Sequence, residues 1–230
     1  MKHFALLFCL LPLEPLAASS ADYLTPRQQH IAVIAALAAK GDMENLKSAL
    51  HRGLDDRLAV SEIKEVLVQL YAYCGFPRSL NALGAFMTVV EERKARGIQD
   101  EPGRDPDPLP ADFQAWEAGR KVQTELVGRP VEGGVFDFAP VINDYLRAHL
   151  FGDIFARNNL DYPSRELATV GALSSIEGLE SQLASHLAVS MNVGLTISQL
   201  RHLATTLKER VGETEGERTA RVLEKALQAR

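Results

Sequence analysis

The sequence predicts an all-α protein made of tandem duplicated helical units. From Thr25 onward, apolar residues recur at the three- and four-residue spacing of amphipathic helices through most of the chain. No stretch alternates convincingly between apolar and polar residues, so we expect little or no β-sheet. Many positions also match in residue type at one constant offset along the chain, which is typical of an internal repeat.

Composition limits the class of protein and the kind of partner. The chain has 230 residues, of which 46% are hydrophobic and 24% charged, as expected for one large globular domain or two small ones. Its net charge of −5 and pI near 5.7 come without clustered basic residues. This balance argues against a nucleic-acid partner.

Residues 1–21 have the three-part layout of a secretory signal peptide. Lys2 precedes an apolar run over residues 4–13, and small residues follow over 17–21. We therefore expect a periplasmic or secreted protein with no membrane contact in its mature form; the alternative is an uncleaved hydrophobic anchor. After cleavage Cys74 is the remaining cysteine, so no disulfide forms within the mature chain.

The first predicted repeat covers residues 22–98. Thr25 to Gln28 offers a helix cap with proline at the first helical position, and the helix it starts ends at Gly41. Gly75-Phe76-Pro77 is expected to break the chain sharply. Three more helices are predicted, over residues 42–52, 61–73 and 78–96.

The rest of the chain is predicted to hold a connection and a second repeat. Residues 99–134 are assigned to a linker and a connecting helix, with an exposed proline-rich and acidic stretch at 99–110. The second repeat covers 135–230 and begins with a helix over 139–155. A later helix ends at Asn192 to Gly194, and Thr196 has capping-box spacing for the next one.

Setting residue n against residue n + 137 aligns the two repeats without a gap. The offset pairs identical residues at helix starts, turns and core positions: Pro26 with Pro163, Gly41 with Gly178, Leu46 with Leu183, Leu58 with Leu195, and Gly75 with Gly212. The chemistry-bearing positions differ instead. His186 and Glu166 correspond to Ala49 and Gln29, whereas the segment 71–77 of the first repeat keeps only its glycine in the second. This division predicts one composite site.

His186 is the leading candidate for chemistry. Leu179, Leu183, Leu187 and Met191 make one apolar helical stripe, and Gln182 with His186 makes a second stripe beside it. His186 is therefore expected at the margin of a buried face. The plainer interpretation is a hydrogen-bonded structural histidine, because a lone histidine at a helix margin is often structural.

Four segments resemble the carboxymuconolactone decarboxylase family, whose helical fold is shared with alkylhydroperoxidase D-like proteins. They are His186 followed after seven intervening residues by Gly194-Leu195-Thr196, then Arg165-Glu166-Leu167, residues 151–155 and residues 71–83. The resemblance implies an enzyme of one of two kinds. The peroxidase relatives use two cysteines before the histidine, but the corresponding positions here are Leu179 and Gln182, so a dithiol mechanism is not expected.

The decarboxylase side of the resemblance implies a carbon–carbon lyase that needs no cofactor. His186 is then the catalytic acid, and Glu166 orients its imidazole or relays its proton. The site needs donors for a carboxylate and for a developing oxyanion, and no residues have the spacing of metal ligands. The substrate, a small lactone or carboxylic acid, is expected to contact Gln182, Arg157, Arg165, Tyr71, Tyr73 and Cys74. The resemblance also implies a homo-oligomer, with a trimer as one arrangement.

Other interpretations stay open on the sequence alone. Cys74 could react with peroxide as a single thiol, or could be a small buried hydrophobic residue. Arg165 and Glu166 could be a capping or intrahelical pair. The tandem could also be a non-catalytic helical binding or assembly module. Among the remaining histidines, His149 has no evident partner, and the others are expected at the surface: His30, His51 and His202.

Overall fold

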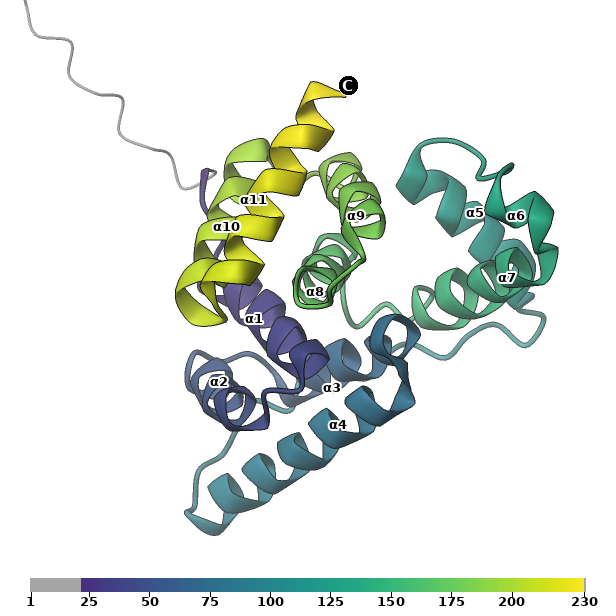
Figure 1. Cartoon of the computed structure of the whole chain (residues 1–230). Coiled ribbons are helices and arrows are strands. Elements are labelled where there is room, and N and C mark those ends of the chain that lie inside the picture. The colour runs from purple at the N-terminus through teal and green to yellow at the C-terminus, as the bar shows by residue number, and fades with distance from the viewer. Residues whose placement is uncertain (1–21, 230) are drawn as a thin grey trace, which may run out of the picture.

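The computed structural model describes residues 22–229, and every regular element in that range is helical (Figure 1). This confirms the all-α prediction. The predicted signal peptide lies outside the described residues. Within the described range, no helix has both the length and the apolar character needed to cross a membrane.

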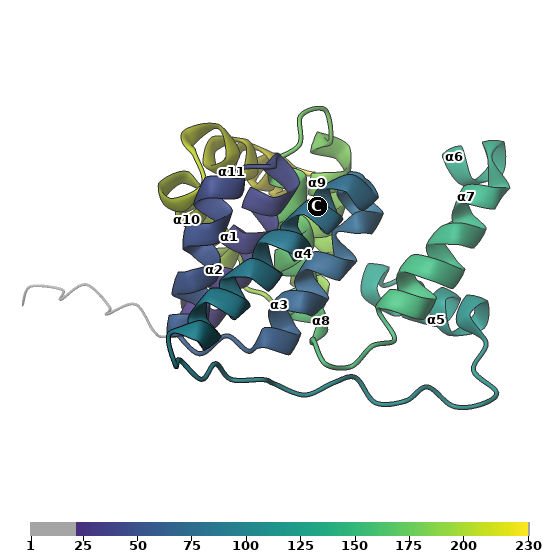
Figure 2. The ribbon, with the colours of Figure 1, turned by 90° about the horizontal axis from the view of Figure 1, so that it is seen from below.

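The helices form one bundle and a separate group beside it. The elements are α1 (Pro26–Lys40), α2 (Met43–Asp55), α3 (Val60–Gln69), α4 (Tyr71–Ala95), α5 (Ala115–Val127), α6 (Val135–Phe138), α7 (Pro140–Tyr145), the π-helix η2 (Leu146–Ile154), α8 (Tyr162–Ser174), α9 (Glu180–Asn192), α10 (Ile197–Arg210) and α11 (Glu213–Gln228). Helices α1–α4 and α8–α11 pack together as the bundle. Helices α5–α7 and η2 stand to one side, and we call them the side group (Figures 1 and 2).

Helix α1 begins and ends as its sequence predicts. The side chain of Thr25 accepts from the backbone N–H of Gln28, whose own side chain accepts from the backbone N–H of Thr25. Gly41 ends the helix in the left-handed region at φ 78°. Residues 30–39 of α1 are all buried, so this helix is the centre of the bundle and needs no polar face.

Helices α1 and α8 pack closely because α8 carries a glycine at their contact. A Cβ at Gly171 would lie 2.4 Å from the carbonyl oxygen of Ala32. Further along the same contact, a guanidinium nitrogen of Arg27 donates to Oγ of Ser164 at 2.9 Å. The two helix backbones therefore approach at a distance that a larger side chain would not allow.

Replacing Gly171 with alanine is expected to destabilise the bundle by about 1–3 kcal/mol, since the added methyl forces α1 and α8 apart. The matched control is Gly84→Ala in α4, where an added Cβ meets nothing within 4 Å. That variant should be as stable as the parent or slightly more so, because alanine favours helix over glycine. Urea unfolding compares the two, and equal free energies of unfolding would show that the close contact is not required.

The break predicted at Gly75 is confirmed, but its surroundings differ from the prediction. Gly75 has φ 78° and ψ 160° inside α4, and Pro77 follows it. The helix predicted over 61–73 instead ends at Gln69, and a new one begins at Tyr71. This change of direction places Tyr73 in the first turn of α4, next to the bundle's second half.

The side group is held together by two helices whose backbones nearly touch. A Cβ at Gly119 of α5 would lie 1.7 Å from the carbonyl oxygen of Arg147, and one at Gly152 of η2 would lie 2.2 Å from that of Ala115. A separate apolar cluster joins this pair to α9: Leu126, Leu150, Phe151, Ile154, Phe155 and Val189. The helix predicted over 139–155 is present, although its second part is a π-helix.

The predicted linker at 99–110 has no regular structure and runs along the edge of the molecule from α4 towards α5 (Figure 2).

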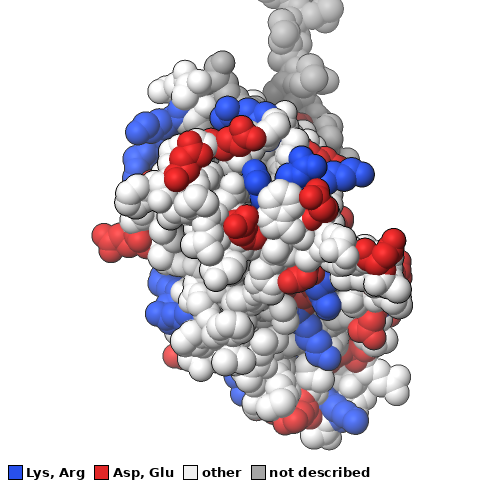
Figure 3. Space-filling model, turned by 90° about the vertical axis from the view of Figure 1, so that its right-hand side faces the viewer, with Lys and Arg blue, Asp and Glu red and all other residues white. Residues whose placement is uncertain are grey.

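The face of the side group is poor in charged residues over its middle (Figure 3). Five large apolar side chains of α6 and α7 are exposed in this group: Val135, Phe138, Val141, Ile142 and Tyr145.

Two histidine predictions were wrong. His30 is 2% exposed rather than at the surface, because it lies on the buried helix α1 with its Nε2 2.6 Å from Asp56. His149 does have a partner, Asp153, whose carboxylate lies 2.7 Å from its Nδ1 across one turn of η2. Asp153 lies four residues after His149, and Asp56 is the residue that follows the end of α2.

Candidate functional site

A cavity of about 620 Å³ lies where the side group meets the bundle. It is bounded by α9, the first turn of α4, the end of α8, and the side group. Most of its walls are apolar, and a few polar groups converge on it, which is typical of small-molecule sites. Its polar lining includes Tyr73, Arg129, Glu132, Gln182, Ser185 and His186.

His186 extends from α9 into this cavity, and a carboxylate of α8 holds its imidazole in place. The Nδ1 of His186 lies 2.8 Å from Oε2 of Glu166, which is fully buried in α8. An ionised carboxylate only accepts hydrogen bonds, so this contact places a proton on Nδ1. In the neutral ring, Nε2 is then the nitrogen available to a substrate. The predicted pairing of His186 with Glu166 therefore exists in space.

Tyr73, which comes from the first half of the chain, packs against the imidazole of His186. Its ring meets that of His186 edge to face, with centroids 5.6 Å apart and planes at 79°. Burial, with the nearby charge of Glu166, raises the pKa of the Tyr73 hydroxyl far above its ordinary value. The phenol is therefore protonated at any pH the fold tolerates.

Two buried polar atoms beside the imidazole have no hydrogen-bond partner within residues 22–229. They are the hydroxyl of Tyr73 and Oε1 of Glu166. Buried polar groups are nearly always paired in folded proteins, so each of these two atoms has capacity for a further hydrogen bond. Together they show that the interior next to His186 is polar, although the cavity walls beyond it are largely apolar.

Gln182 lies one helical turn before His186 on α9 and lines the same cavity. Its side-chain oxygen accepts from Oγ of Ser181 at 2.8 Å, and its amide nitrogen is free to donate. The structure thus brings together four of the residues selected from the sequence: Tyr73, Glu166, Gln182 and His186.

The structure places Arg165 and Arg157 elsewhere. Arg165 is fully buried, and its guanidinium donates to Glu65 at 2.8 Å and to Gln69 at 2.9 Å. Arg157 donates to the same Glu65 at 2.9 Å. Neither arginine lines the cavity. Both act instead in an ion network that ties α3 to α8 and to the segment before it.

The carboxylate of Glu65 is the centre of that network. Burial by itself raises the pKa of Glu65, but hydrogen bonds from Arg157 and Arg165 outweigh it and hold the pKa below the ordinary value. Glu65 is therefore ionised at neutral pH although it is buried. The network explains how an arginine can be fully buried one residue away from the catalytic candidate Glu166.

Tyr71 also lies outside the His186 cavity. Its ring stacks on Phe76 with centroids 4.4 Å apart, and the ring of His149 lies 5.5 Å away. These contacts place Tyr71 at an adjoining hollow of about 310 Å³ between α4, α7 and η2. The spacing of Tyr71 and Tyr73 in the sequence did not reveal that they face different hollows.

Cys74 packs against the bundle core rather than lining the cavity. Its thiol donates to the carbonyl oxygen of Leu70 at 3.1 Å, and burial raises its pKa. A raised pKa means less thiolate at neutral pH, and the thiolate is the reactive form. We expect Cys74 in the folded protein to react with iodoacetamide or peroxide more slowly than in the urea-unfolded chain. Mass spectrometry measures this, and faster reaction in the folded state would favour the thiol-based alternative.

Arg129 and Glu132 are the charged lining residues that sequence reasoning missed. They lie in the segment after α5, where Gly128 ends the helix at φ 81°. The sequence showed only a pause in helical patterning there. A loop has no periodicity that could indicate which of its side chains face a cavity.

Comparison with known proteins agrees with this all-helical fold. Residues 16–87 match the profile of the Carboxymuconolactone decarboxylase family. This part of the chain resembles that family. It is also 29% identical over 97 residues to a 4-carboxymuconolactone decarboxylase of Acinetobacter baylyi, a match that covers 40% of this chain and 71% of the relative. The profile match includes Tyr73 and ends before His186.

Proposed function

We propose that the protein is an exported enzyme that decarboxylates or isomerises a small lactone or carboxylic acid by acid–base chemistry without a cofactor. The family match and the decarboxylase relative support a decarboxylase-like function at the level of the family. The observation that carries the proposal is His186, which faces the cavity while Glu166 holds its Nδ1.

The proposed step starts from an unsaturated lactone acid. Its carboxylate is attached to a ring carbon that is conjugated, through the double bond, with the lactone carbonyl once the carboxylate leaves. The bond between that carboxylate and the ring carbon breaks, carbon dioxide leaves, and the electron pair moves into the ring as an enolate. His186, in its protonated form, then gives the Nε2 proton to carbon. Glu166 stabilises the imidazolium before transfer and keeps the ring oriented afterwards, and solvent restores the lost proton.

The remaining polar groups fit the same step. The amide nitrogen of Gln182 can donate to an oxyanion that develops on the lactone carbonyl, one helical turn from His186. Leu146, Leu150 and Phe151 supply an apolar wall. Because electrostatic interactions are stronger away from water, donors placed at such a wall stabilise a developing charge more than they would in solution.

We also propose that the two halves of the chain are duplicated units that share one site. The bounds of the helices support this, because α9 begins and ends 137 residues after α2 does, which is the offset found in the sequence. Helix α10 likewise begins 137 residues after α3. Tyr73 would then come from the first unit and His186 from the second.

The experiment is a substrate panel with the purified chain. 4-Carboxymuconolactone, related unsaturated lactone acids and their saturated analogues are incubated with the protein, and carbon dioxide and product are followed by NMR. We expect turnover of at least one unsaturated acid and of no saturated analogue, since only the unsaturated ring can take up the electron pair. Turnover of none of them would contradict the proposed reaction. Mass measurement of the protein after expression tests export, which predicts loss of residues 1–21.

A further inference from the structure

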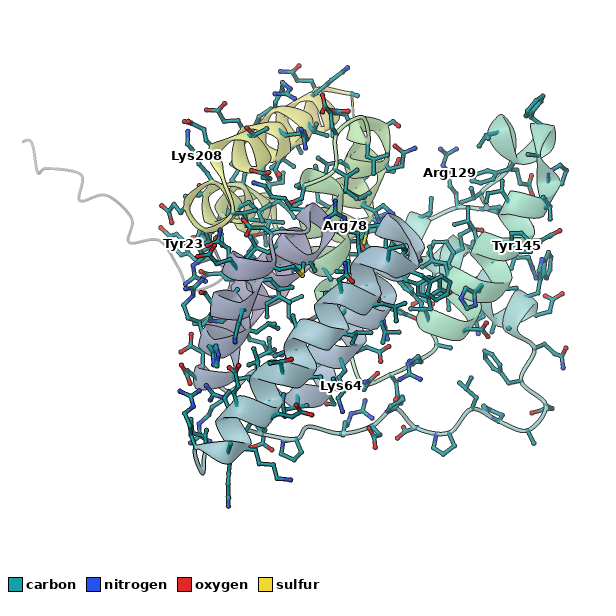
Figure 4. All side chains as sticks on the ribbon, turned by 60° about the horizontal axis from the view of Figure 1, so that its bottom comes forward. Tyr23, Lys64, Arg78, Arg129, Tyr145 and Lys208 are labelled. Carbon is teal, nitrogen blue, oxygen red and sulfur yellow. The ribbon has the colours of Figure 1, made fainter. Side chains whose placement is uncertain are left out.

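The hydroxyl of Tyr73 is a buried polar group that the proposed reaction does not use. Its oxygen is shielded from solvent and has no hydrogen-bond partner among residues 22–229, although the side chain forms part of the cavity wall. The cavity lies on the side of Arg129, which Figure 4 shows between α9 and the helices α6 and α7. A substrate in the cavity therefore meets the ring of Tyr73 and not its hydroxyl.

The unpaired atom that best complements this hydroxyl is Oε1 of Glu166. The other oxygen of that carboxylate holds His186 at 2.8 Å, and the ring of Tyr73 meets the same imidazole edge to face at 5.6 Å. Burial and the charge of Glu166 both raise the pKa of the Tyr73 hydroxyl, so the hydroxyl lies within electrostatic reach of the carboxylate. A protonated phenol donates and an ionised carboxylate accepts, so the two atoms suit each other.

Thr169 is the alternative acceptor for the hydroxyl of Tyr73. Its Oγ1 donates to the carbonyl oxygen of Arg165 at 2.9 Å and accepts from the side-chain amide of Gln69 at 2.9 Å. These bonds already use its proton and one of its two lone pairs. A neutral hydroxyl is also a weaker acceptor than an ionised carboxylate. Glu166 is therefore the better partner for the phenol proton.

We propose that Tyr73 is a positioning residue whose hydroxyl supplies the hydrogen bond that Oε1 of Glu166 lacks, through one bridging water molecule. This inference rests on the proposed function. A bridge fits because the two atoms make no direct bond, and a water-mediated hydrogen bond is nearly as favourable as a direct one. Nε of Arg165, the residue before Glu166 on α8, is also buried and unpaired, and it offers the third partner that a buried water commonly has.

The bridge keeps the proton of the neutral His186 ring on Nδ1. With the donor in place, the anion of Glu166 is stabilised, holds Nδ1–H and leaves Nε2 for the substrate. Without it, the buried carboxylate loses a stabilising donor and takes up a proton from solvent more readily. The resulting carboxylic acid donates to Nδ1, and the ring proton moves to Nε2. Tyr73 in the first half of the chain thus sets the tautomer of His186 in the second.

The test is ¹⁵N NMR of the histidine rings in the parent, in Tyr73→Phe and in the control Tyr71→Phe. A spectrum of His186→Asn identifies the His186 signals. Tyr71 is a second tyrosine of α4, but it lines the adjoining hollow and not the His186 cavity. At neutral pH we expect the ratio of the Nε2–H to the Nδ1–H tautomer to be about 10-fold higher in Tyr73→Phe, the effect of one hydrogen bond to a charged group. Tyr71→Phe should match the parent.

With a lactone acid that is turned over, Tyr73→Phe should also lower kcat by about 10-fold and change KM little, because the ring that faces the substrate remains. Equal tautomer ratios in the parent and Tyr73→Phe would overturn the inference, even if kcat fell. The same change of ratio in Tyr71→Phe would overturn it too. Because the NMR measurement needs no substrate, a changed ratio without turnover of any lactone acid would support the assigned hydrogen bond and contradict the proposed reaction alone.

Discussion

Replacing His186 with asparagine is expected to lower kcat for the turned-over lactone acid by about 100- to 10,000-fold, the usual contribution of a positioned acid or base. Asparagine preserves part of the shape and can still hydrogen-bond to Glu166, but it cannot give up a proton near neutral pH. The measurement is steady-state turnover at saturating substrate. KM should change much less than kcat, because the proton is needed only in the transition state.

The matched control is His149→Asn. His149 is also a histidine held by an acid, with Asp153 at 2.7 Å, but it lines the adjoining hollow and not the His186 cavity. This variant should keep the parent kcat. Similar losses in both variants would show that the effect comes from general structural damage and not from proton transfer.

Replacing Glu65 with alanine is expected to cost about 3–5 kcal/mol of stability, the largest loss anticipated for a single change in this chain. The carboxylate is buried, and its removal leaves the fully buried guanidinium of Arg165 without an ionic partner. Urea unfolding at neutral pH measures the loss. Arg157→Ala is the control: Arg157 binds the same carboxylate but is 41% exposed, so its loss should cost less.

The cost of Glu65→Ala should depend on pH in a defined direction. The folded-state pKa of Glu65 lies below the ordinary value of 4.5, so its ionisation stabilises the folded state above that pH. This contribution is lost as pH falls from about 4.5 through the folded-state pKa, where the native carboxylate takes up its proton. The difference between parent and variant should therefore narrow in acid. A difference that grew with acidity would contradict the assigned charge state.

Local signals predicted much of the fold. The capping boxes at Thr25 and Thr196, the left-handed Gly41 and the break at Gly75 depend on residues within a few positions of each other, so the sequence shows them directly. The pairing of His186 with Glu166 was also anticipated, although it joins two helices. It followed from family resemblance, and no spacing rule would have supplied it.

Contacts between distant segments set the limit of prediction. Arg165 was expected at a substrate because arginine suits carboxylates, but its carboxylate partner proved to be Glu65, which lies 100 positions earlier in the chain. Arg129 was overlooked for the converse reason. It becomes part of the site only because α5 and η2 pack through Gly119 and Gly152 and bring the following loop to α9.

Chemical rescue of a His186→Ala variant tests the central claim most directly, namely that an imidazole held by Glu166 at this cavity transfers the proton. Removing the side chain opens space beside Glu166 that free imidazole can enter. We predict that His186→Ala has little activity alone and that added imidazole restores turnover up to a saturating level. Turnover by His186→Ala at the parental rate without imidazole would contradict the account.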